Sequence, residues 1–125
     1  MKEAGKVTIA ETSKKYGLSA DTLRYYERIG LIPPVPRTKG GVRDYDEGSC
    51  RWIELVKCLR SAGVQIEALI EYGALCRQGE GTEERRKEIL MEQRALLLGR
   101  MEKMQDSLDR LNYKIANYDK ILGKI

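Results

Sequence analysis

Arg24, Tyr25 and Tyr26 occupy adjacent positions in the segment DTLRYYERIGLI, residues 21–32. Successive positions on an α-helix turn by roughly 100°, so these three large side chains cannot all face a core. Arginine and tyrosine side chains donate hydrogen bonds to phosphates, and arginine also binds base edges. The segment therefore fits either a surface that contacts nucleic acid or a solvated helix face with one tyrosine packed against the core.

Basic residues are concentrated around this segment. Residues 14–43 contain seven Lys and Arg but only two acids, Asp21 and Glu27, whereas the whole chain of 125 residues has a net charge of +4. This excess predicts a basic surface patch, which favours an anionic partner. The chain length fits a single small domain, or a small domain with an appendage.

Two short helices are predicted to position the segment. Thr8 and Glu11 form a capping-box pattern at the start of the first helix, and Gly17 ends it. Ser19 caps the second helix, and Gly30 closes it. Two helices joined by a short glycine-containing turn are typical of a helix-turn-helix, whose second helix lies in the major groove of DNA. The contacts expected on that helix are Thr22, Arg24, Tyr25 and Tyr26.

A basic hairpin is predicted directly after the second helix. The three prolines of the chain lie at 33, 34 and 36, which excludes a helix, and the extended arms VPRT and VRDY flank Lys39-Gly40-Gly41. We expect a two-stranded wing that contacts phosphates, although the same pattern also fits an ordinary surface hairpin. The wing residues expected at DNA are Arg37, Lys39, Arg43 and Tyr45.

Two further helices are expected to complete the core. The third begins at Asp46 or Ser49 and ends at Gly63. Its apolar side consists of Trp52, Leu55, Val56, Leu59 and Ala62. The fourth spans residues 66–77, with an apolar side that consists of Ile66, Leu69 and Ile70.

A longer helix follows the loop at 79–81. Apolar residues recur in it at alternating steps of four and three through four heptads, which is the pattern of a coiled-coil seam. The members of the seam are Leu97, Met101, Met104, Leu108, Leu111, Ile115, Tyr118, Leu122 and Ile125. A helix of about 40 residues is on the order of 60 Å long and cannot fold back onto a small domain, so the seam needs a second helix. We expect a second copy of the chain to supply it.

Several classes of protein are excluded by what the sequence lacks. No apolar run approaches the roughly 18 residues of a membrane span, and no signal-peptide pattern is present, so we expect a cytoplasmic protein. There is no His, no CxxC pair and no phosphate-binding glycine motif, so we expect no enzyme, no bound metal and no cofactor. A coiled-coil adaptor would leave the basic wing without a role. A small winged DNA-bending protein without an effector is the alternative to a regulator.

The order of these motifs resembles the MerR family of bacterial transcriptional regulators. The resemblance rests on LRYYERIGLI, the wing pattern R-x-x-G-G-x-R-x-Y and the segment LVKCLRSAGVQIEALIEY. It implies a mainly α fold, with a winged helix-turn-helix domain at residues 1–78 and a long dimerisation helix at 79–125 that forms an antiparallel coiled coil. It also implies a homodimer that binds an inverted repeat in a promoter with a long spacer and distorts the DNA for RNA polymerase. Lys57 and Arg60 would add phosphate contacts.

Cys58 is the candidate effector residue. Its segment KCLRSAG resembles the branch of the family that responds to aldehydes and nitrosative or thiol stress, sometimes called the NmlR or AdhR type, in which a cysteine in this region is implicated. The later cysteines of metal-sensing relatives and the C-terminal domain of drug-sensing relatives are not found in this sequence. Lys57 and Arg60 would favour a reactive thiolate, whereas the negative end of the helix would oppose it. Cysteine is also a common core residue, so simple packing is the alternative.

Overall fold

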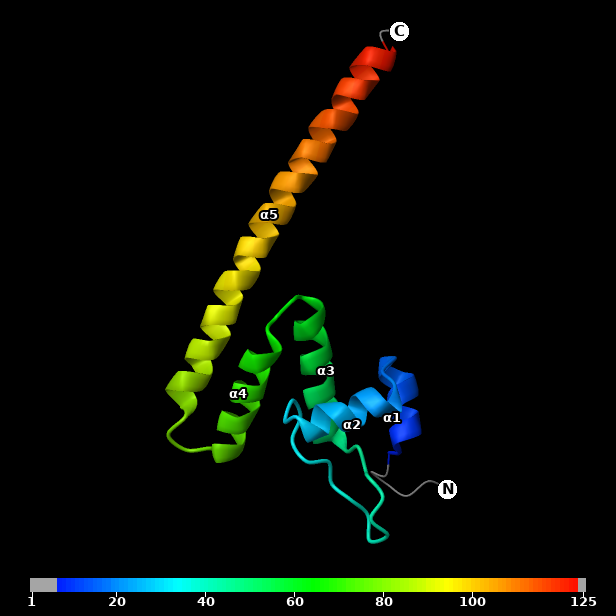
Figure 1. The fold of residues 1–125 in the computed structure, drawn as a ribbon, viewed down its shortest axis with the longest axis vertical. Coiled ribbons are helices and arrows are strands. Elements are labelled where there is room, and N and C mark those ends of the chain that lie inside the picture. Colours follow the sequence, from blue (N-terminus) through cyan, green and yellow to red (C-terminus); the bar gives the residue numbers. More distant parts are fainter. Residues whose placement is uncertain (1–6, 124–125) are drawn as a thin grey trace.

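The computed structural model describes residues 7–123, and the side chains of residues 7–120. Within that range the helices are α1 (Ile9–Tyr16), α2 (Ala20–Arg28), α3 (Glu47–Ser61), α4 (Ile66–Gln78) and α5 (Glu83–Gly123). Helices α1–α4 gather at one end of the molecule, and α5 runs away from them as a single long rod (Figure 1). The expected mainly α fold, a compact unit followed by a long helix, is confirmed.

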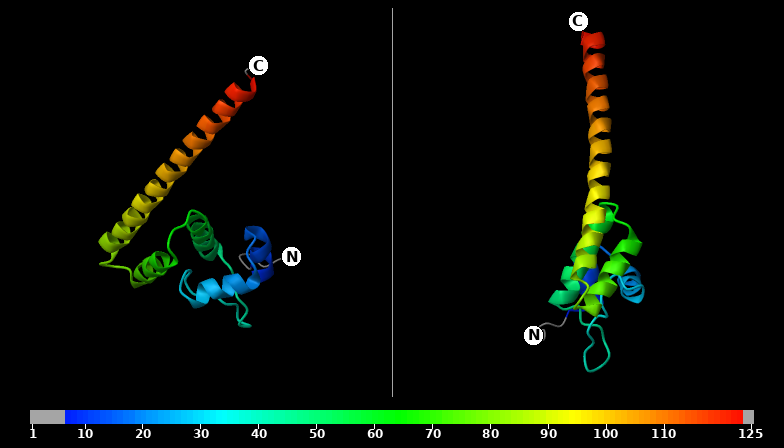
Figure 2. Two further views of the ribbon diagram at one scale, coloured as in Figure 1. Left: turned by 45° about the horizontal axis from the view of Figure 1, so that its top comes forward. Right: turned by 90° about the vertical axis from the view of Figure 1, so that its left-hand side faces the viewer.

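The helix-turn-helix forms as its cap residues predict. Thr8 Oγ1 accepts a hydrogen bond from the Glu11 amide at 3.1 Å, and the Glu11 carboxylate accepts one from the Thr8 amide at 3.0 Å. Ser19 Oγ accepts from the Thr22 amide at 3.0 Å and caps α2. Gly17, in the turn, has a φ of 67°, which glycine adopts without strain. Helix α1 packs against α2, and the two cross in Figure 1 and in the left view of Figure 2.

The wing, residues 36–44, is a loop and not the expected two-stranded ribbon. Its arms are joined by a single antiparallel bridge between Arg37 and Arg43. The Thr38 amide donates to the Val42 carbonyl at 2.8 Å, and the Asp44 amide donates to the Pro36 carbonyl at 2.7 Å. The prediction of strands was wrong because Pro36 lacks the amide hydrogen that the next bridge, between residues 35 and 45, requires.

The core of the compact unit combines α1–α4 with the segments on either side of the wing. Its buried members are Tyr16, Leu23, Leu31, Ile32, Val35, Tyr45, Ile53, Val56, Val64 and Leu69. On α3, Ile53 and Val56 are fully buried, whereas Leu55, which we expected on the apolar side, is 38% exposed. Neighbouring helix positions point roughly 100° apart, so a buried Val56 turns Leu55 towards the surface.

The first turns of α5 pack against α4 and belong to the same packed unit. Ile89 of α5 is only 2% exposed. Leu97 is half-buried and lines a small apolar cavity between α5 and the α3–α4 pair. From residue 101 to residue 120, every side chain is exposed except Asn117, which is half-buried. The division between residues 78 and 79 therefore stays a prediction, since packing continues across it.

Candidate nucleic-acid interface

The central residues of α2 face in different directions. Leu23 is fully buried and Tyr26 packs partly against the core, while Arg24 and Tyr25 are exposed. Arg24 Nη1 donates to Asp21 Oδ1 at 3.0 Å, in a pair whose carboxylate side chain is 96% exposed. Such a solvated pair contributes little to stability, so Arg24 can exchange Asp21 for a phosphate or base edge at small cost.

Two further side chains extend the outward face of α2. Thr22 is half-buried, and its hydroxyl accepts a hydrogen bond from the Ser19 hydroxyl at 2.9 Å within the helix cap. The exposed guanidinium of Arg28 lies over the Tyr25 ring, 5.3 Å from the ring centroid. The sequence-based site omitted Arg28, although its spacing of four from Arg24 places both on one helix face. Arg24, Tyr25 and Arg28 therefore form one continuous surface.

The basic residues of the wing differ in their freedom to bind a ligand. Lys39 is exposed near the tip, and Arg37 Nη1 donates to the Gly41 carbonyl at 2.9 Å in an exposed position. Arg43 is half-buried, and its Nε donates to Oε1 of Glu27 on α2 at 2.7 Å. The wing therefore lies beside α2, and it projects past α2 at the end of the molecule away from the far end of α5 (Figures 1 and 2).

Glu27 is a second residue that the sequence-based site omitted. Its Oε2 accepts a hydrogen bond from the Val35 amide at 2.9 Å while Oε1 accepts from Arg43. Burial alone raises the pKa of Glu27, but the bonds from Arg43 and Val35 outweigh burial and hold the pKa below its usual range. The side chain is thus a carboxylate at neutral pH. Its signal in the sequence is that it is one of two acids in an otherwise basic window.

Tyr45, expected to reach DNA from the wing, lies in the core instead. It is 0% exposed, and its hydroxyl has no hydrogen-bond partner among the described residues. Burial raises the pKa of Tyr45, so the phenol stays neutral. Side chains two positions apart on an extended arm share a side, and here Arg43 and Tyr45 share the side that faces inward. The prediction is corrected: Tyr45 supports the base of the wing from within.

Lys57 and Arg60 both donate hydrogen bonds to main-chain carbonyl groups. The Lys57 ammonium donates to the carbonyl of Tyr16, at the end of α1, and so ties α3 to the turn of the helix-turn-helix. Arg60 Nη1 donates to the Val64 carbonyl at 2.6 Å and closes the last turn of α3. Their contacts with phosphate stay a prediction.

The three cysteines are all free thiols in different surroundings. Cys58 is exposed, whereas Cys50 and Cys76 are half-buried. The Cys50 thiol donates to the Tyr45 carbonyl at 3.6 Å, and the Cys76 sulfur accepts from Arg86 at 4.0 Å. The exposure of Cys58 does not fit the alternative that it serves only to fill the core.

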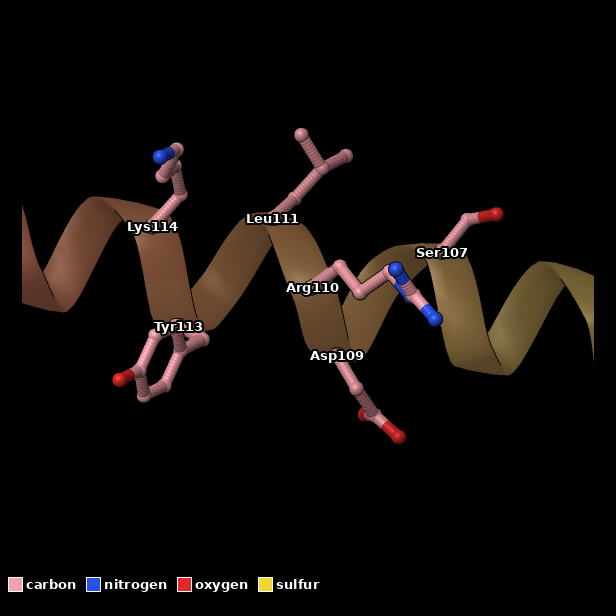
Figure 3. A pocket seen from close by; sticks show the side chains of 6 residues that line it. All are labelled: Ser107, Asp109, Arg110, Leu111, Tyr113 and Lys114. Carbon is pink, nitrogen blue, oxygen red and sulfur yellow. The ribbon is translucent and has the colours of Figure 1, made fainter.

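Other kinds of site are not found in the part of the chain that the structure describes. No group of three or more His, Cys, Asp or Glu residues there could hold a metal ion. No helix within residues 7–123 is long and apolar enough to cross a membrane. A shallow hollow at residues 107–114 is bounded by α5 alone, and Figure 3 shows Leu111 and Tyr113 projecting to different sides of that helix. One helix cannot enclose a ligand, so this hollow is open surface.

An arginine- and tyrosine-bearing second helix beside a basic wing defines a winged helix-turn-helix protein. The family model described as the MerR HTH family regulatory protein matches residues 7–74, which is more than half of the chain. The chain belongs to the MerR family. The family predicted from the sequence motifs is confirmed.

Individual relatives agree with this assignment. The chain is 55% identical over 92 residues to the HTH-type transcriptional regulator AdhR of Bacillus subtilis (strain 168), a match that covers 74% of this chain and 66% of AdhR. A crystal structure of a putative MerR family transcriptional regulator from Listeria monocytogenes is 54% identical, covers 91% of this chain and 86% of that one, and has a TM-score of 0.88. The crystal structure of HiNmlR, described as a MerR family regulator lacking the sensor domain and bound to promoter DNA, is 31% identical, covers 90% of each chain and has a TM-score of 0.81. These named relatives are transcriptional regulators and not enzymes.

Proposed function

We propose that this protein is a cytoplasmic, homodimeric transcription regulator that binds an inverted repeat in promoter DNA. The observation that carries the proposal is the placement of the exposed Arg24 and Tyr25 on α2 next to the basic wing, at one end of the compact unit. Membership of the MerR family and the likeness to the DNA-bound HiNmlR support it. The residues proposed to face DNA are Thr22, Arg24, Tyr25, Tyr26, Arg28, Arg37, Lys39, Lys57 and Arg60.

The seam of α5 supports the homodimer. Its members from residue 101 to residue 118 are 49–72% exposed, and they form an apolar stripe along a helix that otherwise projects into solvent. The exposed members are Met101, Met104, Leu108, Leu111, Ile115 and Tyr118. The side chain of Leu122, and Ile125 altogether, lie outside the described residues. A stripe of this length at coiled-coil spacing is stable only against another helix, and a second copy of α5 has the matching stripe.

A twofold dimer would present two recognition helices and two wings to related half-sites. Binding both half-sites of a promoter with a long spacer would require the DNA to bend and untwist, which would realign the promoter elements for RNA polymerase. Cys58, exposed on the helix that joins the DNA-binding elements to α4, would report electrophiles to this arrangement.

The test begins with the DNA that the protein selects. Fragments bound by the purified dimer are sequenced to define the operator, and affinity for it is measured by gel shift at fixed salt. Arg24→Ala and Tyr25→Ala are each expected to weaken operator binding by roughly 1–3 kcal/mol, as for loss of a base-edge contact. Wild-type binding should weaken steeply with rising salt because phosphate contacts release counterions.

Lys103→Ala is the matched control, since Lys103 is exposed on α5 outside the seam. It should leave operator affinity unchanged. Binding without salt dependence, or wild-type affinity in both folded α2 variants, would show that this surface does not contact DNA.

A further inference from the structure

Glu27 connects α2 to both ends of the segment that contains the wing. One carboxylate oxygen accepts from the Val35 amide at 2.9 Å, just before the wing, and the other accepts from Arg43 Nε at 2.7 Å, near its end. Arg43 is also the residue that pairs with Arg37 across the single bridge of the wing. One side chain of the recognition helix therefore holds the entry and the exit of the wing together.

The Glu27–Arg43 pair is shielded from water, unlike the other ion pair on α2. The side chains of Arg43 and Glu27 are 26% and 15% exposed, compared with 46% and 96% for Arg24 and Asp21. Screening by water weakens exposed ion pairs much more than partly buried ones. Arg43 is therefore held by Glu27, while Arg24 is held only weakly by Asp21.

The wing has one other hydrogen-bonded tie to a separate segment among the described residues: at its exit, Asp44 Oδ1 accepts from the Val7 amide at 2.8 Å. Its base is anchored because Val35 and Tyr45 are buried, but residues 37–43 make only one bridge and no strand. The Gly41 position, at the tip, has nothing within 4 Å of the place that a Cβ would occupy. Among the hydrogen bonds of the described residues, the contact of Arg43 with Glu27 is thus the one nearest the tip that ties the wing to another element.

We infer that Glu27 is a positioning residue, which holds the wing at a set distance from the recognition helix. Arg43 is the wing residue through which Glu27 acts. This inference rests on the proposed DNA-binding function, and it assigns a carboxylate to an otherwise basic surface. Glu27 lowers the local positive charge, but it fixes the spacing at which α2 and the wing meet DNA. The acid should consequently increase discrimination for the operator over random duplex.

Glu27→Gln tests this inference, because an amide oxygen still accepts from Val35 while the charge that holds Arg43 is lost. Asp21→Asn is the matched control: it removes the same charge from the same helix and releases an arginine, but it does not touch the wing. We expect E27Q to weaken operator binding about tenfold, as for loss of a charged hydrogen bond, with random-duplex binding unchanged or slightly tighter. D21N should tighten binding to both duplexes alike. Tighter operator binding by E27Q, to the same extent as by D21N, would mean that Glu27 merely competes with DNA for Arg43.

Hydrogen exchange on the free, full-length protein tests the geometry independently of DNA. The Thr38 and Asp44 amides, which close the wing, should exchange about tenfold faster in E27Q, with the amides of α1 and α4 unchanged. Arg43→Gln approaches the same contact from the other side and should produce the same change. Unchanged wing exchange in both variants would overturn the inference. Failure of the wild-type protein to bind DNA would instead contradict the proposed function. The exchange rates of the wing amides would still show whether Glu27 positions the wing.

Discussion

The Cys58 thiol lies on the surface of α3, and both neighbouring cations are occupied by other groups. Lys57 donates to the Tyr16 carbonyl and Arg60 to the Val64 carbonyl, so neither is bonded to the sulfur. Access of a small electrophile to each thiol therefore depends on how exposed that thiol is. Cys58 is exposed, whereas Cys50 and Cys76 are half-buried. A group added here would sit on the exposed surface of α3.

Cys58→Ser should abolish the response of promoter output to an aldehyde or a nitrosating agent, with little change in operator affinity. The substitution removes the nucleophile and nearly preserves the shape of the side chain. Reporter activity with and without the electrophile measures the effect. Cys50→Ser and Cys76→Ser are the controls and should respond like the wild type. A full response in the C58S strain would exclude the thiol switch.

Arg24 and Arg43 show how one residue type can lie in two different environments. Both are arginines paired with a carboxylate, but only the Arg43 pair is shielded from solvent. Charge places both arginines in the basic window, whereas the tertiary structure leaves Arg24 exposed and half-buries Arg43 against Glu27.

At the scale of elements, α4 approaches the recognition helix closely at Gly73. A Cβ at this position would lie 3.1 Å from the carbonyl oxygen of Gly30, in the turn that leads from α2 towards the wing. Main-chain atoms in such a turn cannot move aside without moving the elements that they join. Gly73 therefore sets the distance between α4 and the base of the recognition helix.

Gly73→Ala is expected to lower the free energy of unfolding by about 1 kcal/mol, because overpacking costs about 1–3 kcal/mol and exceeds the helix propensity gained. Urea unfolding followed by the fluorescence of the single Trp52 measures it. Gly99→Ala is the matched control, since a Cβ at Gly99 on α5 meets nothing within 4 Å. That variant should gain about 1 kcal/mol from helix propensity alone. A higher free energy of unfolding in G73A would show that the Gly30 turn can move away from the added methyl group at little cost.

At the scale of the whole molecule, α5 carries the surface that is proposed to form the dimer. The helix has 41 residues, and only its first turns pack against the compact unit. The remainder projects away from α1–α4 in every view (Figures 1 and 2). Its apolar stripe is thus an interface without a partner in the single chain.

Replacing both Leu108 and Leu111 with Lys should dissociate the proposed dimer, since each chain would bury unpaired like charges at mid-seam. Operator affinity should collapse with assembly, because each monomer retains one wing and one recognition helix. Sedimentation of the variant measures the mass. Tyr113→Lys introduces a charge on a different side of α5 from Leu111 and should leave the dimer intact (Figure 3). An intact dimer in the double variant would place the interface elsewhere.

Local sequence determined the helices and their ends. The caps at Thr8 and Ser19 and the turn at Gly17 involve residues within four positions of one another, so their hydrogen bonds follow from the order of residues alone. The apolar stripe of α5 is predictable for the same reason, since its period repeats along one helix. Two of the three family motifs, LRYYERIGLI and LVKCLRSAGVQIEALIEY, lie mainly on these helices, which explains why the fold class and the family could be predicted from them.

Only the tertiary structure decided how exposed each candidate DNA-contacting residue is. Arg43 is held by a glutamate 16 positions away, and Tyr45 fills a core made by four helices. The close approach of Gly73 to Gly30 likewise joins residues far apart in the chain. Charge and periodicity describe one segment at a time, whereas burial depends on which segments meet. No local pattern could therefore predict that Arg43 is half-buried against Glu27 or that Tyr45 lies in the core.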